Sequence, residues 1–316
     1  MIKPEALKRG DTIGIVAPAS PSFERTTLIR SVKLLEKWGY KVKLGKYVTR
    51  VHGYFAGSDR ERVEDFNAMF RDREVKAIFC LQGGYGSMRL LPQLDYDAIK
   101  KNPKIFLGYS DITALHLAIL QKTGLVTFHG PSVAGLATEE ILSDYTTRYL
   151  LKALTKKTPI GDIEPSPQNP WIWTITPGRA DGQLIGGNLS LVTASLGTPY
   201  EIDTKGKILF LEEVEVEPYH FDMMLTQLLH AGKLKDAAGI VIGECIKCTP
   251  NEFRPGYYSS LSVEDVLLEL LQPLQLPTIY NLPIGHGNNR ATLPIGVMAA
   301  LDATTGRLII KESGVS

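Results

Sequence analysis

Apolar runs of strand length alternate with amphipathic stretches through the first 130 residues of the chain. The apolar runs span residues 12–18, 41–44, 77–81, 105–109 and 126–129. The stretches with helical spacing span residues 25–38, 59–70 and 111–121. Because strands joined by helices run parallel within one sheet, we expect an α/β fold whose N-terminal sheet is mainly parallel and flanked by helices. Ligands of such sheets bind beyond the carboxyl ends of the strands.

The sequence changes character between residues 156 and 182. Five prolines and two tryptophans fall in this stretch, which has no steady period and is typical of a linker. Strand-like and helical patterns resume after it and predict a second, smaller α/β domain with a mixed sheet. Because 316 residues exceed the usual size of a single core, we expect an N-terminal domain over residues 1–155, a linker over 156–182 and a C-terminal domain over 183–316.

Charge and hydropathy exclude several classes of partner. The 35 lysines and arginines are matched by 34 acidic residues, which leaves no basic field for a nucleic acid or an anionic membrane. No apolar run reaches the length of a transmembrane helix or of a signal-peptide core. We therefore expect a soluble, cytoplasmic protein whose partner is a small molecule.

The three cysteines form an odd set without a disulfide framework. Cys245 and Cys248 have the spacing of half a zinc site or of a redox pair, but no second half accompanies them. Cys80 lies in a predicted buried strand. We expect Cys245 and Cys248 to be structural residues after a strand, and we expect no metal and no other cofactor.

The apolar strand at residues 105–109 ends at Ser110, and a helical pattern begins at once with Asp111. So tight a turn pushes the Ser110 hydroxyl out of the sheet edge, while the first free amides of the helix point at whatever approaches it. This is how a serine nucleophile is mounted. A serine that only caps the helix would show the same pattern.

Glycines at 83, 84 and 86 follow the strand at residues 77–81. Glycines there allow a sharp turn that presents backbone N–H groups to an anion. The anion could be a phosphate, but the chain contains neither GxGxxG nor GxxxxGK[ST]. It could also be the oxyanion of a tetrahedral intermediate, held by the amides of Gly84 and Asp111. A plain tight turn is the third interpretation.

Two further segments carry residues suited to acid–base chemistry. The apolar strand at residues 207–211 leads into Glu212 and Glu213, although acids at a strand end are commonly just solvated. His286 stands between two glycines after the extended segment 277–283, where it lacks the packing of a core residue. A serine nucleophile needs a base, and the base needs an orienting acid. The chain holds a candidate for each role.

Six short motifs follow one another over almost the whole chain: GIVAPAS at 14–20, QGGYG at 82–86, GYSD at 108–111, GGNL at 186–189, FLEE at 210–213 and GH at 285–286. Together they resemble the motifs of the LD-carboxypeptidases of peptidoglycan recycling. The resemblance implies a serine peptidase with Ser110 as nucleophile, His286 as base and Glu212 as the acid that orients the base. It also implies two domains with the active site between them, and a homodimer.

The resemblance further implies hydrolysis of the L,D-amide bond that joins a terminal D-alanine to a cytoplasmic muropeptide. The backbone N–H groups of Gly84 and Asp111 would then hold the oxyanion. The leaving D-alanine carries a free carboxylate, for which Arg89 is a candidate partner, with Tyr85 as a second candidate substrate-binding residue. Arg89 can equally be a solvated surface residue.

Three alternative functions remain open. The same family includes self-immunity enzymes that cleave peptidyl-nucleotide antibiotics of the microcin C type. Residues 217–222, through to residues 226–228, look more like the muropeptide branch, although Met223 replaces an arginine or similar polar residue common there. A non-catalytic protein that binds sugars or nucleotides would use the same sheet edge without bringing Ser110, Glu212 and His286 together. A phosphatase or kinase would instead need metal-binding carboxylates.

Overall fold

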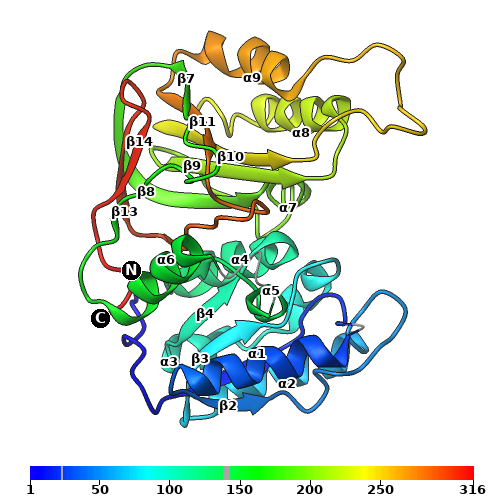
Figure 1. Ribbon diagram of the computed structural model, residues 1–316, viewed down its shortest axis with the longest axis vertical. Coiled ribbons are helices and arrows are strands. Elements are labelled where there is room, and N and C mark those ends of the chain that lie inside the picture. Colours follow the sequence, from blue (N-terminus) through cyan, green and yellow to red (C-terminus); the bar gives the residue numbers. More distant parts are fainter. Residues whose placement is uncertain (23, 138–142) are drawn as a thin grey trace. The chain divides into compact units, whose positions relative to one another are not determined.

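The computed structural model describes residues 1–22, 24–137 and 143–316. The chain forms two compact units (Figure 1). The N-terminal unit contains residues 1–159 together with 290–297 and 313–316, and the C-terminal unit contains residues 160–289 and 298–312. Among the described residues, no helix is both long and apolar enough to cross a membrane.

The N-terminal unit is built on a six-stranded sheet with the order β12-β5-β4-β3-β1-β2. Its strands are β1 (Thr12–Val16), β2 (Lys41–Leu44), β3 (Val75–Cys80), β4 (Ile105–Gly108), β5 (Thr127–His129) and β12 (Leu293–Ile295). Strands β1 to β5 pair in parallel, and only β12 is antiparallel to its neighbour β5. The prediction of a mainly parallel sheet is confirmed.

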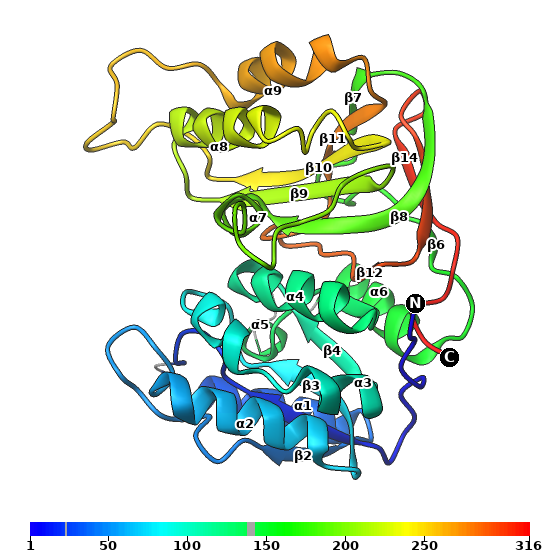
Figure 2. The same ribbon diagram turned by 180° about the vertical axis from the view of Figure 1, so that it is seen from behind.

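Helices cover this sheet. They are α1 (Arg25–Lys37), α2 (Asp59–Arg71), α3 (Tyr96–Lys101), α4 (Thr113–Thr123), α5 (Val133–Leu136) and α6 (Asp144–Thr155), with the 3-10 helices η1 (Ser87–Gln93) and η2 (Ser110–Ile112). Helix α1 packs against α5, whereas α2, α3 and α4 pack together on the side that faces the viewer in Figure 2. Helix α2 begins with a capping box in which Ser58 and Glu61 bond to each other's backbone N–H groups.

An aromatic cluster fixes β4, the strand that leads to Ser110. Phe106 of β4 is buried and packs edge-on against Phe66 of α2, with 5.5 Å between the ring centroids. Phe70, one turn further along α2, lies 6.3 Å from the same ring. Buried aromatic pairs combine a large apolar area with a preferred geometry, so this cluster ties the end of the sheet to α2.

The C-terminal unit is built on an eight-stranded sheet with the order β6-β14-β13-β8-β9-β10-β11-β7. Its strands are β6 (Gly161–Asp162), β7 (Trp173–Thr176), β8 (Arg179–Asn188), β9 (Ile208–Val214), β10 (Gly239–Ile246), β11 (Thr278–Leu282), β13 (Met298–Asp302) and β14 (Arg307–Ile310). The four strands β8 to β11 are parallel and the outer pairings are antiparallel. The helices are α7 (Leu189–Ala194), α8 (Pro218–His230), α9 (Val263–Leu271) and η3 (Gln272–Leu274). The predicted mixed sheet is confirmed.

The structure differs from the expected linker over residues 156–182. That stretch contains β6, β7 and the start of β8, all of which belong to the second sheet. Strands β6 and β7 are the two edges of this sheet, where short strands flanked by prolines are tolerated because one side makes no ladder. The expected C-terminal domain also loses residues 290–297 and 313–316, which belong to the N-terminal unit.

Candidate active site

Ser110 stands at a strained turn between β4 and the helices that follow. Its backbone φ is +61°, in the left-handed region that residues other than glycine rarely adopt. Tyr109 takes the N-cap position of η2 and Ile112 that of α4, so Ser110 is not the N-cap of either helix. Within the described residues the Ser110 hydroxyl donates no hydrogen bond. A strained serine at a strand-to-helix turn is the arrangement of a mounted nucleophile.

His116 supports this turn from inside the unit. It is fully buried in α4, and its Nε2 lies 2.9 Å from the carbonyl oxygen of Gly108, the last residue of β4. Burial lowers the pKa of His116 to about 3, despite the bond to Gly108. The imidazole is therefore neutral at ordinary pH, and Nε2 carries the hydrogen that it donates to Gly108.

The glycine loop at residues 83–86 lies against Ser110. A Cβ atom on Gly83 would lie 2.9 Å from the Cβ of Ser110, so only glycine fits there. Ser20, in the segment that follows β1, fixes the loop: its N–H donates to the Gly83 carbonyl at 3.1 Å, and its Oγ accepts from the Tyr85 N–H at 3.0 Å. The glycine loop and Ser110 therefore meet at the carboxyl edge of the parallel strands, and Ser20 bonds to the loop there.

The N–H groups of Gly84 and Asp111 are the two expected to bind an oxyanion. Gly84 has a φ of +102°, and its N–H makes no hydrogen bond to any described residue. Asp111 lies in the first turn of η2, where N–H groups have no acceptor within the helix. Their role as oxyanion donors stays a prediction.

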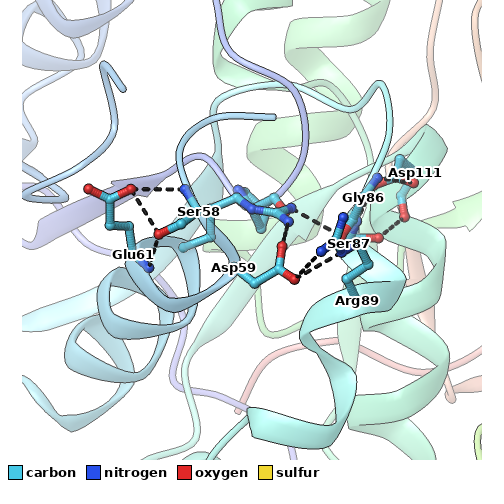
Figure 3. Close-up of polar contacts among 9 residues, drawn as sticks. Ser58, Asp59, Glu61, Gly86, Ser87, Arg89 and Asp111 are labelled. Carbon is cyan, nitrogen blue, oxygen red and sulfur yellow. Dashed lines mark hydrogen bonds and ion pairs between the residues drawn. The ribbon is translucent and has the colours of Figure 1, made fainter. Parts of the chain in front are cut away.

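The Asp111 side chain has a function that sequence reasoning missed (Figure 3). Its carboxylate accepts hydrogen bonds from the N–H of Gly86 at 3.3 Å and of Ser87 at 2.8 Å, while the Ser87 hydroxyl donates to the Asp111 carbonyl at 2.6 Å. Burial raises the pKa of Asp111, and the bonds from Ser87 act against this rise. Asp111 thus ties the glycine loop to the residue next to Ser110.

The two candidate substrate-binding side chains are both exposed. Tyr85 is 59% exposed and stacks on Phe55, with the ring centroids 5.9 Å apart. Arg89 pairs with Asp59 through Nε at 2.9 Å and Nη2 at 2.8 Å, and its guanidinium also lies over the Phe55 ring. A substrate carboxylate would have to share Arg89 with Asp59, so the role of Arg89 stays a prediction.

Glu212 and His286 form a hydrogen-bonded pair in the C-terminal unit. Glu212 lies on β9 and is buried, and its Oε2 is 2.7 Å from Nδ1 of His286. Because a carboxylate accepts, Nδ1 carries the hydrogen, and the lone pair of the neutral imidazole is then on Nε2. The role of His286 as a base stays a prediction. Gly285 has a φ of +93°, and a Cβ there would lie 2.3 Å from Oε2 of Glu212. The glycine before His286 therefore lets the carboxylate reach the imidazole.

Glu213, the next residue, binds the start of α7. Its carboxylate accepts from Nδ2 of Asn188 at 2.9 Å and from the N–H and Oγ of Ser190 at 2.8 and 2.6 Å. Asn188 and Ser190 lie at the start of α7. Since adjacent side chains of a strand point to opposite faces, Glu212 contacts His286 while Glu213 holds α7 to the sheet.

Sequence reasoning also missed Glu244, which lies next to the His286 segment. An extra residue interrupts the pairing of β10 with β9 between Ile242 and Cys245, and this bulge contains Glu244. A Cβ on Gly287 would lie 1.6 Å from Oε2 of Glu244, so the carboxylate is in contact with the backbone beside His286. A buried acid within an apolar strand pattern gives a weak signal, because nothing in the sequence marks the bulge.

The cysteines are placed partly as expected. Cys80 is buried in β3, but Cys245 lies within β10 and only Cys248 follows the strand. A hydrogen bond with Cys248 raises the pKa of the Cys245 thiol well above its usual value. In the part of the chain that the structure describes, no group of three or more histidines, cysteines or acids could hold a metal ion.

Two family models match the chain over the regions that carry these residues. The model of the LD-carboxypeptidase N-terminal domain matches residues 13–130, which include Ser110. The model of the LD-carboxypeptidase C-terminal domain matches residues 181–301, which include Glu212 and His286. The chain belongs to the LD-carboxypeptidase family. As a member of this family, it is a serine-type hydrolase and not a non-catalytic binding protein.

Similar proteins extend over nearly the whole chain. The probable murein peptide carboxypeptidase of Bacillus subtilis (strain 168) is 46% identical over 317 residues, covering 99% of this chain and 95% of that protein. The microcin C7 self-immunity protein of Escherichia coli is 30% identical over 335 residues, covering 97% of this chain and 95% of that protein. The crystal structure of a muramoyltetrapeptide carboxypeptidase from Oxalobacter formigenes has a TM-score of 0.81 and 30% identity, covering 95% of this chain and 99% of that one.

Proposed function

We propose that this LD-carboxypeptidase removes the terminal D-alanine from muropeptide tetrapeptides in the cytoplasm, as a step of peptidoglycan recycling. The observation that carries the proposal is the 2.7 Å pair of His286 and Glu212, combined with the strained turn that presents Ser110. A binding site needs neither a strained serine nor an oriented imidazole. The 46% identity to a probable murein peptide carboxypeptidase supports the muropeptide as substrate.

The proposed reaction begins when Nε2 of His286 takes the proton of the Ser110 hydroxyl as Oγ attacks the carbonyl carbon before D-alanine. The oxyanion that forms accepts hydrogen bonds from the Gly84 and Asp111 N–H groups. Glu212 stabilises the charged imidazole and keeps Nδ1 protonated. The imidazolium then gives its proton to the nitrogen of D-alanine as the amide bond breaks, and water hydrolyses the ester on Ser110 with His286 again as base.

Recognition of the leaving residue follows from its chemistry. An exopeptidase that cleaves before a terminal D-alanine must bind a free carboxylate, and we assign this contact to Arg89, with Tyr85 as a neighbour on the glycine loop. We also propose that the enzyme is a homodimer, as the family resemblance implies. Light scattering of the purified protein tests the dimer by its mass in solution.

The test is release of D-alanine from L-Ala-D-isoGlu-mDAP-D-Ala, measured beside the C-terminal amide and the L-alanine epimer. A subsite built to hydrogen-bond the carboxylate leaves its donors unsatisfied with the amide, so we expect the amide to react about 10⁴-fold more slowly. Ser110→Ala should abolish release from the tetrapeptide. Equal rates for the tetrapeptide and its amide would contradict the exopeptidase assignment.

The 30% identity to the microcin C7 self-immunity protein supports a second candidate, hydrolysis of a peptidyl-nucleotide. The same assay separates the two functions. Fast cleavage of a peptidyl-nucleotide of the microcin type with poor cleavage of the tetrapeptide would place this chain in the self-immunity branch.

A further inference from the structure

Arg62 is an arginine with no exposed side-chain surface, placed on α2 behind the glycine loop. Its Nη1 donates to the carbonyl oxygens of Pro18 at 2.6 Å and of Gly86 at 3.0 Å, and its Nη2 pairs with Asp59 at 2.5 Å. The guanidinium also lies 4.7 Å from the centre of the Phe55 ring. The side chain thus joins the end of β1 to the end of the glycine loop.

Stability alone does not explain this arginine. Burial lowers the pKa of Arg62, which shows the cost of desolvating its charge. Replacing a buried ion pair with well-packed apolar side chains is often neutral or stabilising. An arginine kept at this cost points to a demand for geometry, because its planar fork fixes two acceptors at once.

The group that Arg62 fixes is the Gly86 peptide, which Asp111 holds as well, as Figure 3 shows. Arg62 binds the Gly86 carbonyl, and Asp111 accepts from the Gly86 and Ser87 N–H groups. Gly86 has a φ of +114°, and a Cβ there would lie 2.5 Å from the Phe55 ring and 3.0 Å from Nη1 of Arg62. The backbone here has little room to move.

The restraints surround one N–H group and leave it unused. Ser20 holds the Gly83 carbonyl and the Tyr85 N–H, and Arg62 and Asp111 hold Gly86. Between them, the Gly84 N–H makes no hydrogen bond within the described chain. Preorganised donors of this kind stabilise an oxyanion because they need not reorganise during the reaction.

We infer that Arg62 is a positioning residue for the oxyanion loop: by fixing the Gly86 carbonyl, it aims the Gly84 N–H at the oxyanion of the tetrahedral intermediate. This inference rests on the proposed function, because the oxyanion exists only in that reaction. Arg62 touches no reacting atom. Its effect should therefore appear in the transition state and spare the binding of substrate.

The test compares Arg62→Met and Arg62→Lys with Arg71→Met, a matched control at the exposed end of the same helix. With the tetrapeptide, Arg62→Met should lower kcat about 10²-fold, the scale of one lost oxyanion donor, and change KM less than about threefold. A tripeptide boronate, whose adduct with Ser110 places an oxygen in the oxyanion position, should bind weaker by the same factor as kcat/KM. The product tripeptide should bind equally well. Arg62→Lys should recover about tenfold of the lost rate, since it restores one donor.

Parallel losses of kcat, product affinity and thermal stability in Arg62→Met would show a merely structural role. Full activity of Arg62→Met would overturn the inference. If Arg62→Met does not fold, the partial loss expected for Arg62→Lys decides the question. Labelling of Ser110 by a fluorophosphonate separates this inference from the proposed substrate, because the probe also places an oxygen in the oxyanion position. Normal labelling of the wild type without D-alanine release would refute the proposed substrate, and Arg62 would then be judged by the labelling rate. No labelling of the wild type would refute both.

Discussion

Exchanging each of two adjacent glutamates for glutamine should produce opposite defects. Glu212 accepts from Nδ1 of His286, so Glu212→Gln turns an amide toward the imidazole, favours the hydrogen on Nε2 and removes the charge that stabilises the imidazolium. The loss of a triad carboxylate lowers kcat by about 10³- to 10⁴-fold, or about 4 to 5.5 kcal/mol in the barrier. KM and the free energy of unfolding should change little, because the glutamine keeps the shape of the side chain.

Glu213→Gln should instead destabilise the fold. The carboxylate accepts three hydrogen bonds from Asn188 and Ser190, and a glutamine has one acceptor oxygen to offer them. Bonds to a charged group contribute about 1.5 to 3 kcal/mol each, so losing one or two of them should cost about 2 to 4 kcal/mol of unfolding free energy. The activity of the folded protein should fall less than about tenfold.

Both variants are compared with the wild type by initial rates of D-alanine release and by urea denaturation followed by circular dichroism. The expected result is an inactive, stable Glu212→Gln and an active, less stable Glu213→Gln. The reverse pattern would refute the assignment of Glu212 as the acid that orients His286.

Two further predictions concern pH and metals. The pKa of His116 is about 3 in the folded state against 6.5 for an unperturbed histidine, so the unfolded state binds the extra proton and stability falls as the pH drops from 6.5 toward 3. By pH 5 this should remove about 2 kcal/mol from the unfolding free energy of the wild type relative to His116→Gln. The exposed control His230→Gln should leave the dependence of the unfolding free energy on pH unchanged. The same dependence on pH in the wild type and in His116→Gln would contradict the prediction. Activity should survive treatment with EDTA, because the nucleophile, base and oxyanion donors all come from the chain, and loss on chelation with recovery on adding zinc or magnesium would overturn the mechanism.

The sequence was sufficient to predict the parts of the fold that have a strong period. Strand β2 and helices α1 and α2 lie within one residue of where the patterns place them, and the parallel order of β1 to β5 follows from the alternation of strands and helices. Because parallel strands end at one edge, Ser110 and the glycine loop could be expected to meet. The edge strands β6 and β7 could not be predicted, because short strands among prolines have no period to detect.

The supporting residues of the site were harder to foresee. Arg62 lies in a helix rich in charged residues, and nothing in the local pattern distinguishes a buried arginine from a solvated one. Glu244 owes its place to a bulge that depends on pairing between strands. Alternation along β9 predicts that Glu212 and Glu213 face opposite ways, but only the fold shows which of them contacts His286.

The central claim is that Ser110 is a nucleophile activated by His286. Its most direct test is treatment of the wild type with a fluorophosphonate, followed by peptide mass spectrometry to locate the adduct. We expect one adduct on Ser110, and labelling about 10³-fold slower in His286→Ala, the scale of a lost triad member. An adduct on another serine, or equal labelling rates in the two proteins, would contradict the account.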